Sequence, residues 1–205
     1  MRIILAYDDQ DASLGTFFQA CAQDITQYIQ QHTSFQISSI DSNSLSMEAI
    51  DKEVTTMDEP FLFLAYSHGI EDQLCCDNYC REAYVKTPGN TYLFSRSFFY
   101  TFSCKTAEIL GEVLAQNQQM VYIGYTGVVE GDNDMIMNDL VECTNYGVKL
   151  FLQGKSQYEV VSGMWEKYTD CLVKWLDLDE GKAVIFRRNR DALCPRGENL
   201  DISQL

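Results

Sequence analysis

Two residues that together could make an activated nucleophile each follow an apolar run of the sequence. His68 comes one serine after the run FLFLAY at residues 61–66, and Cys104 comes one serine after FFYTF at residues 98–102. A thiol with an ordinary pKa is a weak nucleophile at neutral pH, and an adjacent imidazole activates it by accepting its proton. If the two runs are neighbouring strands, His68 and Cys104 have the residue types and the placement of such a pair.

Backbone groups near these two residues could complete the chemistry of acyl transfer. Gly69 follows His68 and offers an N–H with no side chain in the way, and the N–H of Cys104 could serve as a second donor. Two fixed donors of this kind stabilise the oxyanion of a tetrahedral intermediate. A helix predicted to begin at about Lys105 would place its N-terminus behind the sulfur and favour the thiolate.

The first 125 residues alternate between strand and helix patterns. Strands are predicted at residues 2–7, 35–40, 60–66, 98–102 and 120–125, with helices at about 14–31, after Ser44 and at 105–116. This alternation is typical of right-handed βαβ units and a parallel sheet covered on both faces. Reactive groups in such sheets lie beyond the carboxyl ends of the strands, and adjacent strands lie about 5 Å apart. The pattern therefore predicts that His68 and Cys104 share one small site.

The rest of the chain fits a single domain over residues 1–205. A short hairpin is predicted within 71–93, two amphipathic helices at about 134–152 and 156–176, and a last strand at 182–187. With 205 residues, three prolines and no Ser/Gly-rich tract, the chain has the size of one generous domain and no evident linker.

The net charge of the chain and the length of its apolar stretches limit which molecules it is expected to bind and where in the cell it is expected to lie. The net charge is −15 and the pI is about 4.4, which disfavours binding to nucleic acid or to anionic membranes and favours basic peptides. No apolar stretch reaches the roughly 20 residues of a membrane span. The N-terminus lacks the features of a signal peptide, so we expect a cytoplasmic protein whose eight cysteines stay reduced.

The two motifs resemble those of a known family. An apolar block ending in His-Gly ("FLFLAYSHG"), followed by one ending in a small residue and Cys ("FFYTFSCKTA"), is similar to caspase-like (clan CD) cysteine peptidases. The segment "VYIGYTG" resembles the bacterial CHAT-domain proteases within that group. The resemblance implies a three-layer α/β caspase-like sandwich with a mainly parallel central sheet flanked by helices. It also implies that Cys104 is the nucleophile, His68 the proton shuttle and Gly69 an oxyanion-hole donor, without a cofactor.

The function that this resemblance implies is that of a cysteine endopeptidase. Such an enzyme would cleave a specific protein substrate under the control of a partner or a ligand, and CHAT members suggest a role in bacterial antiviral defence. Acidic residues near the predicted site, Asp72, Asp132 and Asp134, would favour cleavage after Lys or Arg if one of them lines the substrate pocket.

Three other interpretations compete with this one. Cys75, Cys76 and Cys80 lie close after His68 and could hold zinc, but their spacing is not the usual paired C-x₂-C, so no metal is predicted. The Asp8-Asp9 pair after the first strand is typical of a phospho-acceptor receiver domain, but the other positions such a domain needs carry the wrong residues. A non-catalytic caspase-like module that binds a partner remains the main alternative.

Overall fold

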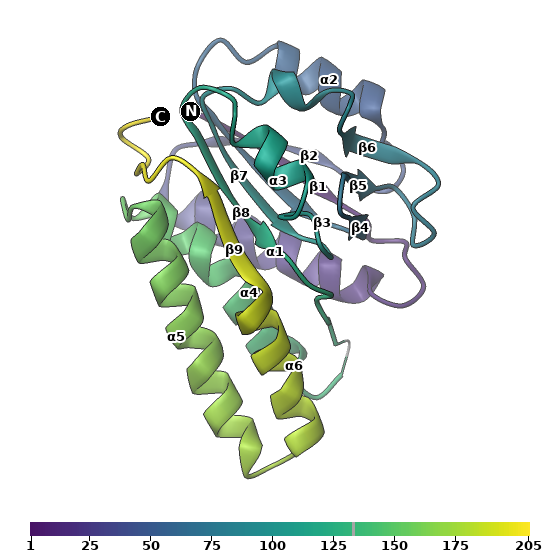
Figure 1. Ribbon diagram of the computed structural model, residues 1–205, viewed down its shortest axis with the longest axis vertical. Coiled ribbons are helices and arrows are strands. Elements are labelled where there is room, and N and C mark those ends of the chain that lie inside the picture. The colour runs from purple at the N-terminus through teal and green to yellow at the C-terminus, as the bar shows by residue number, and fades with distance from the viewer. Residues whose placement is uncertain (133) are drawn as a thin grey trace.

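The central sheet has six strands and is mainly parallel, as predicted. The computed structural model describes residues 1–132 and 134–205 (Figure 1). The strands, in their spatial order, are β2 (Gln36–Ile40), β1 (Arg2–Tyr7), β3 (Phe61–Tyr66), β7 (Ser97–Phe102), β8 (Met120–Tyr125) and β9 (Leu193–Gly197). The first five are parallel to one another, and β9 runs antiparallel to β8.

Helices cover both faces of the sheet, which confirms the three-layer α/β arrangement. One layer holds α1 (Gly15–His32), α4 (Met137–Leu152), α5 (Gln157–Leu176) and α6 (Glu180–Ala192). The other holds α2 (Met47–Thr55), α3 (Leu110–Leu114) and a small antiparallel sheet of β4 (Gly69–Ile70), β5 (Gln73–Cys75) and β6 (Ala83–Lys86). A short 3₁₀ helix, η1 (Thr91–Leu93), follows β6.

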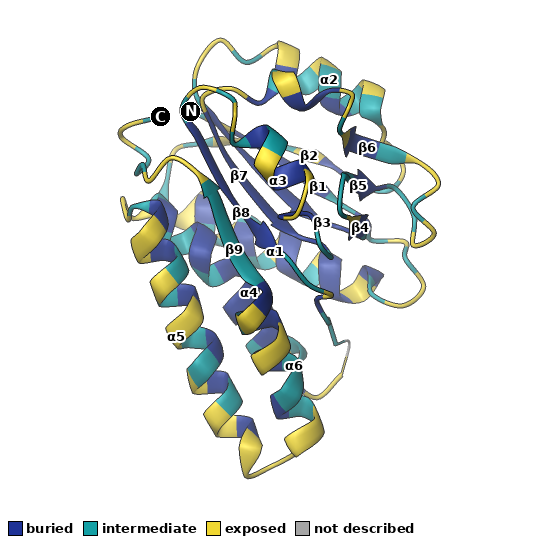
Figure 2. Cartoon of the chain, viewed as in Figure 1, coloured by how far each residue is buried: buried dark blue, intermediate teal, exposed yellow. Residues whose placement is uncertain are grey.

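The sheet separates two apolar cores. Alternate residues of a strand point to opposite faces, so Leu62 and Leu64 of β3 join the core under α1 and α4, whereas Phe61 and Phe63 join the core under α2 and α3. The three strands β3, β7 and β8 are buried along their whole length (Figure 2). Strands buried on both faces are continuously apolar, which is why their pattern is clear in the sequence.

Residues 182–187, predicted as the last strand, instead lie within α6. The Asp179 carboxylate caps this helix by accepting the N–H of Lys182. Ala183, Phe186 and Asn189 are buried at a spacing of three residues, which is a helical spacing, and the strand that closes the sheet begins only at Leu193.

The helix predicted at 105–116 is reduced to α3, which begins at Leu110. Lys105 has a φ of 59°, outside the helical region, and the backbone N–H groups of Lys105 and Ala107 donate to the carbonyls of Gly127 and Tyr125. These bonds to the end of β8 and to the loop after it replace the first helical turns. The prediction of a helix N-terminus directly behind Cys104 is therefore wrong.

No helix within the described parts of the chain combines the length and the apolar character needed to cross a membrane.

Candidate active site

The ends of β3 and β7 bring the two candidate segments into contact. These strands pair in parallel, in a register that runs from Phe61 opposite Ser97 to Tyr66 opposite Phe102. His68 and Cys104 therefore each lie two residues beyond a matched pair of strand ends. A hydrogen bond links the two segments: the hydroxyl of Ser103 donates to the carbonyl oxygen of Ser67 at 2.8 Å.

Gly69 packs tightly between these segments. A Cβ atom at this position would lie 2.9 Å from Cβ of Ser103 and 2.7 Å from Cγ2 of Thr106. Both distances are shorter than an ordinary carbon–carbon contact. The absence of a side chain thus allows the chain after His68 to lie directly on the turn after Cys104.

His68 faces a carboxylate that follows the first strand. Its Nε2 lies 3.3 Å from Oδ2 of Asp11, and the ring meets that of Phe18 edge to face at 5.7 Å between centroids. This buried Nε2 atom has no hydrogen-bond partner among the described residues. The imidazole can therefore turn without breaking a hydrogen bond at Nε2.

Asp11 is held as an anion by its own loop. Burial acts to raise its pKa, but hydrogen bonds from the Ser13 hydroxyl and from the N–H groups of Leu14 and Ser13 outweigh burial and lower the pKa of Asp11. The carboxylate is only 3% exposed. Asp11 thus presents a charged carboxylate to the His68 ring.

A second carboxylate lies nearby, on Asp8. Its N–H donates to the carbonyl of Tyr66 at the end of β3, and its side chain accepts a hydrogen bond from Ser42 at 2.8 Å. Burial raises the pKa of Asp8 despite that bond. Sequence reasoning considered Asp8 only for a receiver domain and missed Asp11. The signal that could have found Asp11 is a carboxylate after the first strand, because β1 is the neighbour of β3.

The thiol of Cys104 interacts with a different partner. It is half-buried, and its Sγ donates to the carbonyl oxygen of Val129, in the loop after β8, at 3.7 Å. Burial raises the pKa of Cys104, and a backbone hydrogen bond at Val129 and the nearby charge of Lys105 oppose this only in part. No hydrogen bond joins His68 to Cys104 among the interactions of residues 1–132 and 134–205. The thiol is therefore protonated at neutral pH.

An ion pair links the segment after His68 to the segment after Cys104. Nζ of Lys105 lies 2.7 Å from Oε1 of Glu71, and this hydrogen bond lowers the pKa of Glu71 and raises that of Lys105. The carbonyl of Glu71 also accepts the N–H groups of Ile109 and Leu110. The loop after β4 and the turn after Cys104 are thus tied by backbone and side chain.

The three carboxylates predicted for substrate binding lie outside these contacts. Asp132 forms an ion pair with Lys182 of α6 and is 8% exposed. Asp134 is exposed and donates its N–H to the Asp132 carboxylate, while the carbonyl of half-buried Asp72 accepts the N–H of Thr87. The carboxylate that faces His68 within the described chain is instead that of Asp11.

An acidic pocket opens beside His68. It has a volume of about 330 Å³ and is lined by Asp8, Gln10, Asp11, Ala12, Ser42, Cys76, Asp77 and Asn78. Asp8 and Asp11 of the pocket follow β1, whereas Cys104 follows β7. In the sheet, β3, which ends two residues before His68, lies between those two strands, so the ends of β1 and β7 are about two strand spacings or 10 Å apart.

The cysteines near His68 differ from the expected reduced state. Cys75 and Cys80 form a disulfide, and Cys76 is a free thiol whose pKa burial raises to about 11. The described residues contain no group of three or more ligands able to hold a metal ion. The disulfide closes the end of β5, where the N–H of Cys75 donates to the carbonyl of His68.

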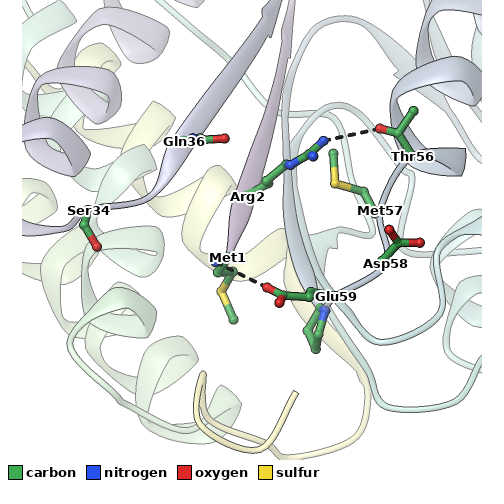
Figure 3. A pocket seen from close by; sticks show the side chains of 9 residues that line it. Met1, Arg2, Ser34, Gln36, Thr56, Met57, Asp58 and Glu59 are labelled. Atoms are coloured by element: carbon green, nitrogen blue, oxygen red, sulfur yellow. Dashed lines mark hydrogen bonds and ion pairs between the residues drawn. The ribbon is translucent and has the colours of Figure 1, made fainter.

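A further pocket lies at the opposite edge of the sheet (Figure 3). It is formed at the amino ends of β1 and β3, where Arg2 donates to Thr56 at 3.4 Å and the amino group of Met1 lies 3.8 Å from Glu59. The residues that line it include no cysteine and no histidine. This pocket therefore lacks both residue types that are the catalytic candidates at the carboxyl ends.

The raised pKa of Cys104 predicts its reactivity in the absence of substrate. We expect the rate of alkylation by iodoacetamide to rise about tenfold per pH unit from pH 7 to 9, because only the thiolate reacts and its fraction grows with pH. Mass spectrometry of the Cys104 peptide measures that rate. A plateau reached below pH 7 would contradict the prediction, since it would reveal a preformed thiolate–imidazolium pair.

The sheet order, the layers and the paired strand ends define a caspase-like fold. Caspase-1 from Spodoptera frugiperda has a similar structure, with a TM-score of 0.58 over 96% of this chain and 85% of that one, at 13% sequence identity. Protein GSU0716 from Geobacter sulfurreducens is also similar, with a TM-score of 0.53 over 100% and 96% of the two chains, at 11% identity. No family model matches the sequence, and no curated protein matches it. At these identities the likeness concerns the fold.

Proposed function

We propose that this protein is a cysteine endopeptidase whose nucleophile is Cys104 and whose proton shuttle is His68. The observation that carries the proposal is the in-register pairing of β3 with β7, which brings the segments that end in His68 and Cys104 into contact. The caspase-like fold supports a protease-type function. The CHAT resemblance and the defence role stay predictions.

The proposed reaction uses groups at this edge of the sheet. With substrate bound, the sulfur leaves the Val129 carbonyl, gives its proton to His68 and attacks the peptide carbonyl carbon. The oxyanion accepts hydrogen bonds from the N–H groups of Gly69 and Cys104. His68 then protonates the departing amine, and it activates the water that hydrolyses the thioester.

Asp11 serves as a positioning residue in this proposal. Its carboxylate lies against Nε2 of His68, where it favours the imidazolium that forms when Cys104 loses its proton. Catalytic hydrogen bonds in substrate-free structures are often long and tighten when substrate binds. The separate partners of His68 and Cys104 in the resting protein are consistent with that behaviour.

Control of activity follows from the same resting geometry. The thiol is protonated and bonded to Val129, so a substrate, a partner protein or a ligand has to move it before it reacts. We extend the proposal to regulation by such a partner or ligand, acting on the loop that carries Val129.

The proposed substrate is a peptide with Lys or Arg before the cleaved bond. The acidic pocket beside His68 carries Asp8, Asp11 and Asp77, and the chain has a net charge of −15. Opposite charges attract a basic side chain to this pocket. The pocket thus offers a different set of carboxylates from Asp72, Asp132 and Asp134, of which Asp132 already pairs with Lys182.

An irreversible peptide probe tests this substrate class. We expect acyloxymethyl ketones with Lys or Arg next to the reactive carbonyl to label Cys104 at least about tenfold faster than the same probe with Asp, because like charges repel in the acidic pocket. Mass spectrometry of the labelled peptide measures the rate and the site. Faster labelling by the Asp probe would overturn the basic preference and leave the nucleophile assignment standing.

A non-catalytic partner-binding module is the second candidate. The observation that favours it is the neutral thiol of Cys104, bonded to a backbone carbonyl instead of His68. Under this function no peptide probe would label Cys104 faster than iodoacetamide does. Labelling that depends on the peptide sequence would exclude it.

A further inference from the structure

A pair of buried thiols joins two helices away from the candidate active site. Cys143 of α4 and Cys171 of α5 have their sulfur atoms 3.4 Å apart, and the Cys143 thiol donates toward Cys171. Cys143 is fully buried, whereas Cys171 is 6% exposed. Neither residue contributes to the proposed protease chemistry.

The two thiols differ in acidity because they share this contact. The hydrogen bond from Cys143 lowers the pKa of Cys171, and the same bond, together with burial, raises the pKa of Cys143. The ammonium of Lys167, on α5, further favours the Cys171 thiolate. Cys171 is therefore the nucleophile of the pair, and Cys143 is a protonated thiol held next to it.

The acidic and basic side chains around Cys143 and Cys171 nearly balance one another in charge. Asp139 and Glu142 of α4 face the pair and oppose ionisation of Cys171. Each is itself neutralised across the helix interface, because Lys174 pairs with Asp139 at 2.7 Å and Lys167 pairs with Glu142 at 2.5 Å. These pairs also fasten α4 to α5 on both sides of the thiols.

We propose that Cys143 and Cys171 form a reversible redox site that closes a disulfide between α4 and α5 on exposure to a hydroperoxide. The Cys171 thiolate attacks one oxygen of the peroxide, the O–O bond breaks, and the products are a sulfenic acid and hydroxide, or alkoxide from an organic peroxide. The Cys143 sulfur then attacks the Cys171 sulfur, the S–O bond breaks, and water leaves with the Cys143 proton. The two sulfurs are oxidised and the peroxide is reduced.

Of the free cysteines in the described chain, Cys143 and Cys171 are the best placed to form a disulfide, because their sulfur atoms are in contact. A disulfide has a sulfur–sulfur distance of about 2.05 Å, so the two atoms, now 3.4 Å apart, must approach by roughly 1.4 Å to form the bond. Within the described chain, Cys21, Cys76, Cys104 and Cys194 make no such sulfur–sulfur contact. The cross-link would join residues on helices that are already in tight contact, since Gly147 of α4 packs on Met164 of α5.

The experiment uses the whole chain with Cys104→Ala, so that the proposed catalytic thiol takes no part. Protein is treated with hydrogen peroxide, remaining thiols are blocked, and peptides from a digest without reductant are analysed by mass spectrometry. We expect a peptide pair linking Cys143 to Cys171, its loss on addition of dithiothreitol, and a melting temperature several degrees higher in the oxidised form. Cys21→Ser, which alters a buried thiol outside the pair, should still form the link.

Other outcomes overturn the proposal. An oxidised sample in which Cys171 stops at a sulfenic acid, trapped by dimedone while Cys143 stays free, would show that the second thiol cannot close the bond. Unreacted thiols at both positions, at a peroxide dose that oxidises Cys104 in the wild type, would show that the pair is inaccessible. Both results are read from folded protein that retains Cys143 and Cys171. They therefore do not depend on the stability of a variant at either of these two positions.

Discussion

Cys104→Ala is expected to lower the rate of peptide cleavage by about 10⁴-fold or more while the protein remains folded, because no other group can form the thioester. The thiol is half-buried and its hydrogen bond within the described residues is to the Val129 carbonyl, so the change should alter the free energy of unfolding by no more than about 1 kcal/mol. A peptide-library cleavage profile and a thermal melt, both on wild type and variant, measure these two effects.

Cys194→Ala is the matched control for this prediction. Cys194 is also a half-buried free thiol that donates to a backbone carbonyl, that of Pro195, and burial also raises its pKa. It lies on β9, at the edge of the sheet, so full cleavage activity is expected. Proteolysis that persists unchanged in Cys104→Ala would remove the nucleophile assignment.

Gly69→Ala is expected to lower cleavage by about 100-fold with little loss of folded protein. The added methyl group would overlap Ser103 and Thr106 on the turn that holds Cys104, so the segment after His68 has to move away from that turn. A displacement of about 1 Å between catalytic groups costs a factor of this size. The same movement shifts the Gly69 N–H that is proposed to bind the oxyanion. Steady-state kinetics should show the loss in kcat more than in KM.

Two further variants separate this effect from a general cost of replacing glycine. Gly181→Ala places a methyl group in the first turn of α6, where the nearest atom is a side-chain oxygen of Asp179 at 3.2 Å, and should leave activity unchanged. Thr106→Ser removes the closest methyl group but keeps the hydroxyl that accepts from Tyr122. Combined with Gly69→Ala, it should restore part of the activity. Full activity in Gly69→Ala alone would show that the close packing here is not needed.

Local sequence patterns are sufficient for the central part of the fold. The strands β3, β7 and β8 are buried on both faces, and a strand in that position must be continuously apolar. The polar residues that end those runs mark the carboxyl edge of the sheet, which is why the apolar pattern alone assigns His68 and Cys104 to one edge.

Elements whose form depends on distant contacts are predicted less well. The segment 182–187 is apolar enough for a strand, and the Asp179 cap together with packing against the rest of the helical layer makes it helical. The residues after Cys104 have helix-forming sequence, but their N–H groups bond to carbonyls at the end of β8 and in the loop beyond it. Neither set of contacts can be read from the local pattern.

The amino-acid sequence by itself determined the apolar strands, the α/β class and the presence of an imidazole and a thiol at strand ends, because these follow from the burial and alternation of nearby residues. Only the tertiary structure decided which groups those side chains meet. Asp11 reaches His68 because β1 pairs with β3, and Val129 holds the Cys104 thiol because its loop folds back over the end of β7. Such pairings join segments far apart in the chain, and their geometry is set by the packing of the whole sheet.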